Sequence, residues 1–111
     1  MQLNIKATEL ELTPSLRIYL EQKLGALSKL ISALEAEGQP ELRVEVGRTS
    51  RHHHHGLVYR AEADLRLPGK VLRAEHTDLD LRVAVDRLRD KLRLEIEKYK
   101  TKNTRRPQVR N

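Results

Sequence analysis

The chain of 111 residues has no cysteine, no tryptophan and no phenylalanine. Because cysteine is absent, disulfide bonds and thiolate metal sites are excluded. A chain of this length forms one domain with a modest core. Because phenylalanine and tryptophan are absent, that core must be built mainly from leucine, valine, isoleucine and alanine.

Long apolar segments are also missing. No run approaches the roughly 20 residues that a membrane-spanning helix needs. The N-terminal segment, residues 1–6, is too short and too polar for a secretory signal peptide. We therefore expect a cytoplasmic protein.

The sequence shows none of the compact motifs that carry catalysis. It contains no glycine-rich phosphate loop and no nucleophile elbow. His76 with Asp78 and Asp80 could be read as a catalytic or metal cluster. However, His76 ends an apolar alternation that is typical of a packed strand, and both aspartates suit the start of a helix. We expect neither an enzyme nor a bound cofactor or metal.

Four consecutive histidines, His52 to His55, lie inside the chain. A metal site needs ligands that converge on one point, whereas adjacent side chains of an extended segment point in alternating directions. We expect an exposed loop without a physiological metal. In an alternative interpretation, these histidines become protonated below about pH 6.5, and their charge adds to that of Arg48 and Arg51. RNA binding would then be tighter at mildly acid pH.

Positive charge is concentrated at the end of the sequence. The chain has 22 lysines and arginines against 16 aspartates and glutamates, a formal net charge of +6. Residues 101–111 carry four of these cations and no acid. Such a tail is typically disordered when free and favours phosphate backbones or acidic surfaces. The plainer interpretation is a solubilising tail without a partner.

Alternating apolar and polar residues predict four strands, over residues 2–7, 42–46, 57–67 and 72–76. A long turn over 47–56 separates the second strand from the third. The segment Leu67-Pro68-Gly69-Lys70 predicts a type II turn. These turns are too short for parallel crossovers, so the last three strands should form an antiparallel meander.

The first predicted helix begins at Pro14, with Thr13 as its N-cap. Its apolar stripe continues to Leu34, and Gly38-Gln39-Pro40 ends it.

A second, long helix is predicted over residues 78–100. Its buried stripe consists of Leu81, Val85, Leu88, Leu92, Ile96 and Tyr99. Thr77 with Asp80 resembles a capping box at its start. Cations flank the stripe on both sides, with an acidic strip of Asp86, Asp90 and Glu97 between them.

The element order is therefore β-α-β-β-β-α. We predict an α+β fold, a two-layer sandwich in which two helices cover the apolar face of a four-stranded sheet. The domain should span residues 1–100, with a basic tail over 101–111. The other face of the sheet alternates arginine with acidic residues, and we expect cross-strand ion pairs there. It lacks the exposed aromatics on which RNA bases would stack, because Tyr59 falls on the apolar side.

The second helix is the candidate RNA surface. On its own it could be an ordinary salt-bridged surface helix, but the basic tail and the lysines of the first helix favour contact with phosphates. Recognition should depend on shape and phosphates rather than on base sequence. The candidate RNA-binding residues are Lys23, Lys29, Arg82, Arg87, Arg89, Lys91, Arg93, Lys98, Lys100, Lys102, Arg105 and Arg106.

Several segments match a known family in order and spacing. They are Met1-Gln2-Leu3-Asn4-Ile5, Leu12-Thr13-Pro14-Ser15-Leu16-Arg17 with Tyr19, Lys23-Leu24 and Lys29, Tyr59-Arg60-Ala61-Glu62, Pro68-Gly69-Lys70, Leu72-Arg73-Ala74-Glu75, and Asp80, Ala84, Val85-Asp86, Asp90-Lys91-Leu92, Lys98 and Lys100. On these residues the chain resembles the ribosome hibernation-promoting factor family, also called the ribosome-associated inhibitor or sigma-54 modulation protein family.

The resemblance implies a fold akin to the double-stranded-RNA-binding domain with an extra N-terminal strand. It implies binding to the small ribosomal subunit, to 16S rRNA and ribosomal proteins in the mRNA and tRNA channel, and reversible silencing of translation in starvation or stationary phase. By the same resemblance Lys23, Lys29, Lys91, Lys98 and Lys100 would contact rRNA phosphates.

The chain departs from the family pattern at Arg82, where tyrosine is usual, and at Leu94, where arginine is common. It looks like the short form, and promotion of ribosome dimers or of inactive monomers both stay open. The alternative functions are a general double-stranded-RNA-binding module and a protein-interaction domain whose tail contacts an acidic partner.

Overall fold

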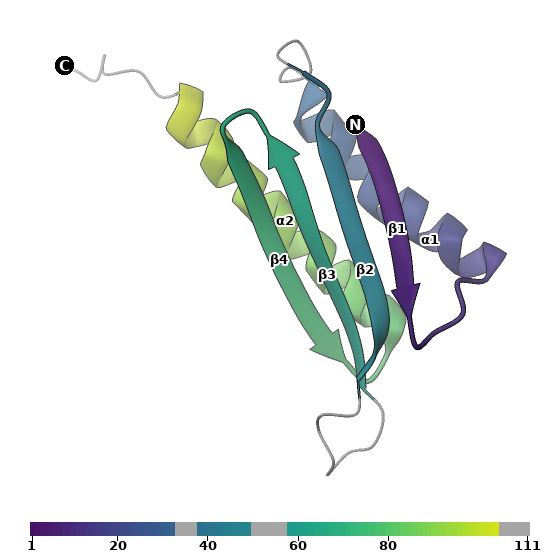
Figure 1. The fold of residues 1–111 in the computed structure, drawn as a ribbon. Coiled ribbons are helices and arrows are strands. Elements are labelled where there is room, and N and C mark those ends of the chain that lie inside the picture. Colours follow the sequence, from purple (N-terminus) through teal and green to yellow (C-terminus); the bar gives the residue numbers. More distant parts are fainter. Residues whose placement is uncertain (33–37, 50–57, 105–111) are drawn as a thin grey trace.

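The computed structural model describes residues 1–32, 38–49 and 58–104. In chain order its elements are β1 (Gln2–Thr8), α1 (Pro14–Gly25), the 3₁₀ helix η1 (Ala26–Leu30), β2 (Glu41–Thr49), β3 (Val58–Leu67), β4 (Lys70–Asp78) and α2 (Leu81–Thr104). Figure 1 shows α1 and α2 side by side on one face of a four-stranded sheet. The predicted α+β fold and the order of its elements are confirmed.

The strands are arranged in the sheet in their chain order, β1-β2-β3-β4. β2, β3 and β4 form the predicted antiparallel meander. β1 pairs in parallel with β2, with Leu3 opposite Leu42 and Ile5 opposite Val44. A parallel pair needs a crossover connection, and α1 supplies it.

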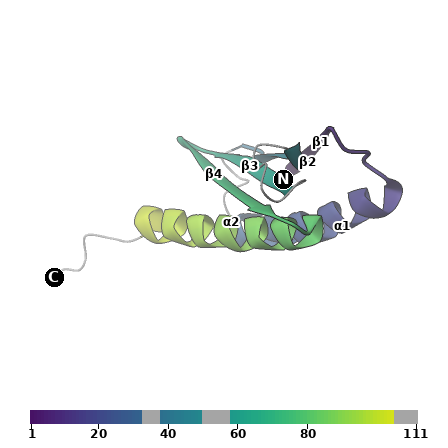
Figure 2. The same ribbon diagram turned by 90° about the horizontal axis from the view of Figure 1, so that it is seen from below.

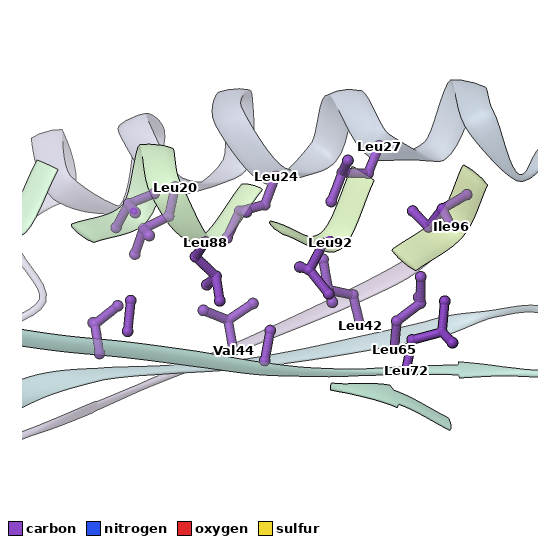
Figure 3. Packing of buried hydrophobic residues seen from close by; sticks show 14 of the residues in the cluster. Leu20, Leu24, Leu27, Leu42, Val44, Leu65, Leu72, Leu88, Leu92 and Ile96 are labelled. Atoms are coloured by element: carbon purple, nitrogen blue, oxygen red, sulfur yellow. The ribbon is translucent and has the colours of Figure 1, made fainter. Parts of the chain in front are cut away.

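The core lies between the sheet and the two helices, which the view in Figure 2 shows as separate layers. Alternate residues of each inner strand face this core, so that Val44, Leu65 and their in-register neighbours are buried. In Figure 3, Leu20 and Leu24 of α1 and Leu88 and Leu92 of α2 extend from the helices toward the sheet residues Val44 and Leu42. As the composition predicts, the core is aliphatic, with Tyr99 as its one aromatic member among the described residues.

The first helix changes character along its length. It begins at Pro14, and the Thr13 hydroxyl accepts a hydrogen bond from the amide of Leu16 at 3.2 Å, as an N-cap does. The α-helix ends at Gly25 and continues as η1, so the prediction of one α-helix to Leu34 is wrong in length. Leu27 and Ile31 are nevertheless buried as predicted, and Leu34 lies outside the described residues.

Helix α2 begins three residues later than predicted. Thr77 remains in β4, so the capping box of Thr77 with Asp80 is wrong. Asp80 is itself the N-cap, because its Oδ1 accepts from the amides of Arg82 at 2.9 Å and Val83 at 3.4 Å. At its other end the helix continues to Thr104, four residues past the predicted end.

The turns follow the sequence where the structure describes them. Gly69 has φ 73°, the positive value that the third position of a type II turn requires. β2 continues to Thr49, so part of the predicted turn over 47–56 is strand. The histidines His52–His55 lie outside the described residues.

Candidate nucleic-acid interface

Charge is divided unequally between the two layers of the molecule. Helices α1, η1 and α2 carry eleven lysines and arginines against five aspartates and glutamates. The four strands carry seven against six. The net positive charge of the described residues therefore belongs almost entirely to the helical layer.

The open face of the sheet neutralises its own charges. Arg60 of β3 pairs with Glu75 of β4 and with Glu62 on its own strand. Arg73 of β4 lies 3.2 Å from Asp64 of β3. The hydrogen bond from Arg60 holds the pKa of Glu75 below its usual value. The predicted cross-strand ion pairs are confirmed, and they leave this face with little net attraction for a polyanion.

A cluster of four side chains joins α1 to α2. The Tyr19 hydroxyl donates to Asp86 Oδ1 at 2.5 Å, and Lys23 Nζ lies 3.6 Å from the same oxygen. The guanidinium carbon of Arg82 lies 4.5 Å from the centre of the Tyr19 ring, a cation–π distance. Burial and then the Asp86 carboxylate raise the pKa of Tyr19 from 10.0 to about 12, because both disfavour the phenolate.

Two of the predicted RNA-binding lysines hold the backbone of other elements. Lys91 Nζ donates to the carbonyl of Glu75 at 2.8 Å, at the edge of the sheet that β4 forms. Lys100 Nζ donates to the carbonyl of Leu30 at 2.8 Å, at the end of η1. A lysine ammonium has three donors, so the contact of Lys91 with Glu75 leaves others for a ligand.

Other predicted cations on α2 make weak pairs on the surface. Arg87 lies 3.9 Å from Asp90, Arg89 3.0 Å from Asp90, and Lys98 3.7 Å from Glu95. The exposed pairs of Arg87 and Lys98 contribute little, about 0–1 kcal/mol, so a phosphate can compete for these two cations. The Arg89–Asp90 pair is partly buried and hydrogen-bonded.

The side chains of three further cations make no hydrogen bond or ion pair with any residue that the structure describes: Lys29, Arg93 and Lys102. All three are exposed. The predicted contacts Arg105 and Arg106 lie outside the described residues.

The candidate catalytic cluster does not assemble into a site. Asp78 and Asp80 cap the start of α2, with Asp78 Oδ1 accepting from the amide of Asp80 at 2.9 Å. His76 is partly buried in β4. Within residues 1–32, 38–49 and 58–104, no group of three His, Cys, Asp or Glu side chains is placed to hold a metal ion. Over the same residues, no helix is long and apolar enough to cross a bilayer.

The role of Tyr19 was missed by reasoning from the residues alone. It lies four positions before Lys23, on the side of α1 that faces α2. A partly polar aromatic between two leucines of the apolar stripe is the signal that marks such a position, because a buried tyrosine hydroxyl needs a hydrogen-bond partner.

The sequence matches the model of a protein family described as "Sigma 54 modulation protein / S30EA ribosomal protein" over residues 3–104. A "Ribosome hibernation promotion factor" of Lactococcus lactis is 32% identical over 110 residues, which cover 96% of this chain and 54% of the relative. A "Ribosome hibernation promoting factor" of Azotobacter vinelandii is 33% identical over 97% of this chain and 91% of its own length. The chain thus spans about half the length of the Lactococcus relative and most of the Azotobacter one.

Solved structures share the fold. The N-terminal domain of Thermus thermophilus Protein Y superposes with a TM-score of 0.71 at 28% identity, covering 89% of this chain and 99% of that one. A ribosomal subunit interface protein from Coxiella burnetii gives a TM-score of 0.74 at 21% identity, over 91% of this chain and 99% of that one. With a family model matched over nearly its whole length, the chain belongs to the Sigma 54 modulation protein / S30EA ribosomal protein family.

Proposed function

We propose that this protein silences translation in starvation or stationary phase by binding the small ribosomal subunit in the channel for mRNA and tRNA. The observation that carries the proposal is the excess of positive charge on the helical layer, opposite a sheet whose cations and acids are nearly balanced and in which Arg60 and Arg73 are paired with carboxylates. A surface of this kind attracts the phosphate backbone of a structured RNA. The relatives are named ribosome hibernation factors, which supports ribosomal RNA as the RNA that this surface binds.

Within the helical layer, the outer surface of α2 is the proposed centre of contact. Arg87, Arg93 and Lys98 project from it, and their side chains make at most weak ion pairs with described residues. Lys29 and Lys102 extend the same charge along η1 and the end of α2. Lys23, Arg89, Lys91 and Lys100 lie at the borders of this surface, where they also stabilise the fold. Arg105 and Arg106 would add contacts beyond the helix.

No step of this function requires a cofactor or catalysis. The protein would act in the cytoplasm, where it would exclude mRNA and tRNA by occupying their binding channel. The inhibition would be reversible because phosphate contacts are weakened by salt and by competing RNA.

A pull-down from stationary-phase lysate tests the partner. The protein should recover small ribosomal subunits as its dominant RNA. A triple variant, Arg87→Gln, Arg93→Gln and Lys98→Gln, should recover much less. The matched control carries Lys6→Gln, Arg66→Gln and Lys70→Gln, which remove the same charge from the strands, and should retain the subunits.

Recovery of mixed duplex RNA without enrichment of ribosomal subunits would reject the proposal. It would indicate the alternative function, a general double-stranded-RNA-binding module.

A further inference from the structure

A hollow of about 450 Å³ opens at one end of the molecule, between the segments that lead into α1 and α2. Figure 1 shows both of these connections at the same end of the sheet. Leu10 and Glu11 border the hollow on one side, and Leu79 and Asp80 on the other. The side chain of Leu79 is 67% exposed, which leaves a large apolar group facing solvent beside a cavity.

Arg82 lines this hollow, and its guanidinium contacts the ring of Tyr19. Its guanidinium carbon lies 4.5 Å from the centre of the Tyr19 ring, and Tyr19 is fixed by its 2.5 Å hydrogen bond to Asp86. Among the residues that the structure describes, no carboxylate pairs with the Arg82 guanidinium. The Arg82 side chain is therefore held beside the Tyr19 ring, and the residue is exposed to solvent.

The chemistry of the hollow disfavours a phosphate. Two carboxylates, Glu11 and Asp80, line it together with the single cation Arg82. The amides at the start of α2 are already occupied, because Asp80 Oδ1 accepts from Arg82 and Val83. Four leucines, Leu10, Leu16, Leu79 and Leu81, contribute to the rest of the lining, together with Thr13 and Tyr59.

A flat, uncharged group with N–H donors suits this combination. Arginine planes stack on unpaired RNA bases, apolar side chains pack against base faces and edges, and carboxylates accept hydrogen bonds from amino groups. The positive helical layer adjoins the hollow through Arg82 and would bring RNA to it.

We propose that Arg82 and this hollow bind one unpaired nucleobase, which stacks on the Arg82 guanidinium and packs against Leu79. The carboxylates of Glu11 and Asp80 favour bases that carry an amino group over uracil. The inference rests on the proposed function in that the base belongs to a structured RNA. It assigns Arg82 a stacking role in place of a phosphate contact.

The test uses the full chain and an RNA hairpin with 2-aminopurine in its single-stranded loop. Binding should change the fluorescence of the 2-aminopurine, because its stacking changes. Arg82→Lys retains the charge and removes the plane. It should weaken binding to the hairpin roughly five- to tenfold and abolish the fluorescence change, while binding to a fully paired duplex stays the same. Arg17→Lys, an equivalent change on the exposed side of α1, is the control and should behave as the wild type.

A second variant tests the apolar wall without endangering the fold. Leu79→Ser should also weaken hairpin binding, whereas Ile18→Ser, which removes a side chain that is 53% exposed on α1, should not. An unchanged fluorescence response in Arg82→Lys, or hairpin binding by Leu79→Ser equal to that of the wild type, would overturn the inference. A wild-type protein that stacks the loop base but recovers no ribosomal subunits would support the base site and reject the proposed function.

Discussion

At the scale of single residues, Tyr19 and Asp86 make the most consequential contact between the two helices. Their hydrogen bond joins residues 67 positions apart, and Lys23 neutralises the carboxylate from the side of α1. Because the phenol must stay protonated to donate, the contact persists only below the pKa of Tyr19. That pKa is raised from 10.0 to about 12.

Replacing the carboxylate should lower this pKa. In Asp86→Asn the negative charge is lost, while the positive charges of Arg82 and Arg89 remain and favour the phenolate. Ultraviolet difference titration of the wild type against Tyr19→Phe isolates the Tyr19 phenol. The same difference, measured in the Asp86→Asn background, should show ionisation at a clearly lower pH. An unchanged titration would mean that Asp86 does not hold the phenol.

The same shift predicts how stability depends on pH. A pKa that is higher in the folded than in the unfolded state contributes stability that is present below about pH 10 and is lost as the pH rises toward about 12. The free energy of unfolding of the wild type should therefore fall more steeply over this interval than that of Tyr19→Phe. Urea unfolding at stepped pH measures the difference, and parallel curves would contradict it.

Gly47 lies where β1 and β2 approach each other closely. A Cβ at this position of β2 would lie 2.6 Å from the backbone carbonyl oxygen of Thr8 on the neighbouring strand. Gly47→Ala should therefore lower the free energy of unfolding by about 1–3 kcal/mol, the range of overpacking. Gly25→Ala is the matched control, since nothing lies within 4 Å of its added Cβ. In a helical position it should raise the stability by up to about 1 kcal/mol. Urea denaturation measures the free energy of unfolding of both variants. Equal changes for Gly47→Ala and Gly25→Ala would contradict the close approach of the strands.

At the scale of elements, α2 is fastened to the rest of the fold by polar contacts as well as by its apolar stripe. Tyr99 donates its hydroxyl hydrogen to the carbonyl of Pro68 at 2.8 Å, in the turn between β3 and β4. Lys91 and Lys100 donate to the carbonyls of Glu75 and Leu30. The three contacts hold the helix to β4, to the hairpin turn and to η1, so the cations of its outer surface are presented in a fixed arrangement.

Lys100 should accordingly contribute to stability. Lys100→Met keeps most of the side-chain length and removes the donor to Leu30, which should cost about 1–2 kcal/mol of unfolding free energy. Lys102→Met is the control, because Lys102 lies two residues further along the same helix and is exposed. It should lower the free energy of unfolding much less. Thermal or urea unfolding compares the two variants, and equal stabilities would show that the Lys100 contact is not maintained in solution.

The parts of the fold that follow from periodicity were predictable. Leu88, Leu92 and Ile96 repeat at helical spacing, and Leu42, Val44 and Val46 alternate as a strand does, so both patterns identified the core directly. The burial of a repeating apolar stripe can be predicted from the local sequence, without knowing which element packs against it.

Helix ends and long-range polar contacts were less predictable. The sequence offers both Thr77 and Asp80 as caps for α2, and only the length of β4 decides between them. The change from α1 to η1 likewise leaves the apolar stripe intact, so the stripe could not reveal it. Lys100 meets a carbonyl 70 residues away, and nothing in the local pattern distinguishes it from an exposed lysine such as Lys102.

At the scale of the whole molecule, the fold separates two kinds of charged surface. Arg43, Arg60 and Arg73 of the sheet pair with neighbouring carboxylates, and the helices carry an excess of cations. This separation supports the proposal that the helical side binds a polyanion. The proposed base site at the start of α2 would lie at the border of that side.

The salt dependence of RNA binding should reveal which cations take part. Each phosphate contact removed lowers the slope of log affinity against log salt by roughly 0.7 to 0.9. A double variant, Arg87→Gln with Lys98→Gln, should therefore flatten the slope by about 1.5. Arg66→Gln with Lys70→Gln removes equal charge from the strands and should leave the slope nearly unchanged. Equal slopes for the two double variants would place the RNA elsewhere.

The proposed function requires that the helical layer bind the small ribosomal subunit and thereby stop translation. Co-sedimentation with purified small subunits, run beside an in-vitro translation reaction containing the same protein, tests it most directly. We expect stoichiometric binding with loss of translation, and recovery of translation when Arg87, Arg93 and Lys98 are all replaced by glutamine. Absence of the protein from the subunit fraction, with translation unimpaired, would contradict it.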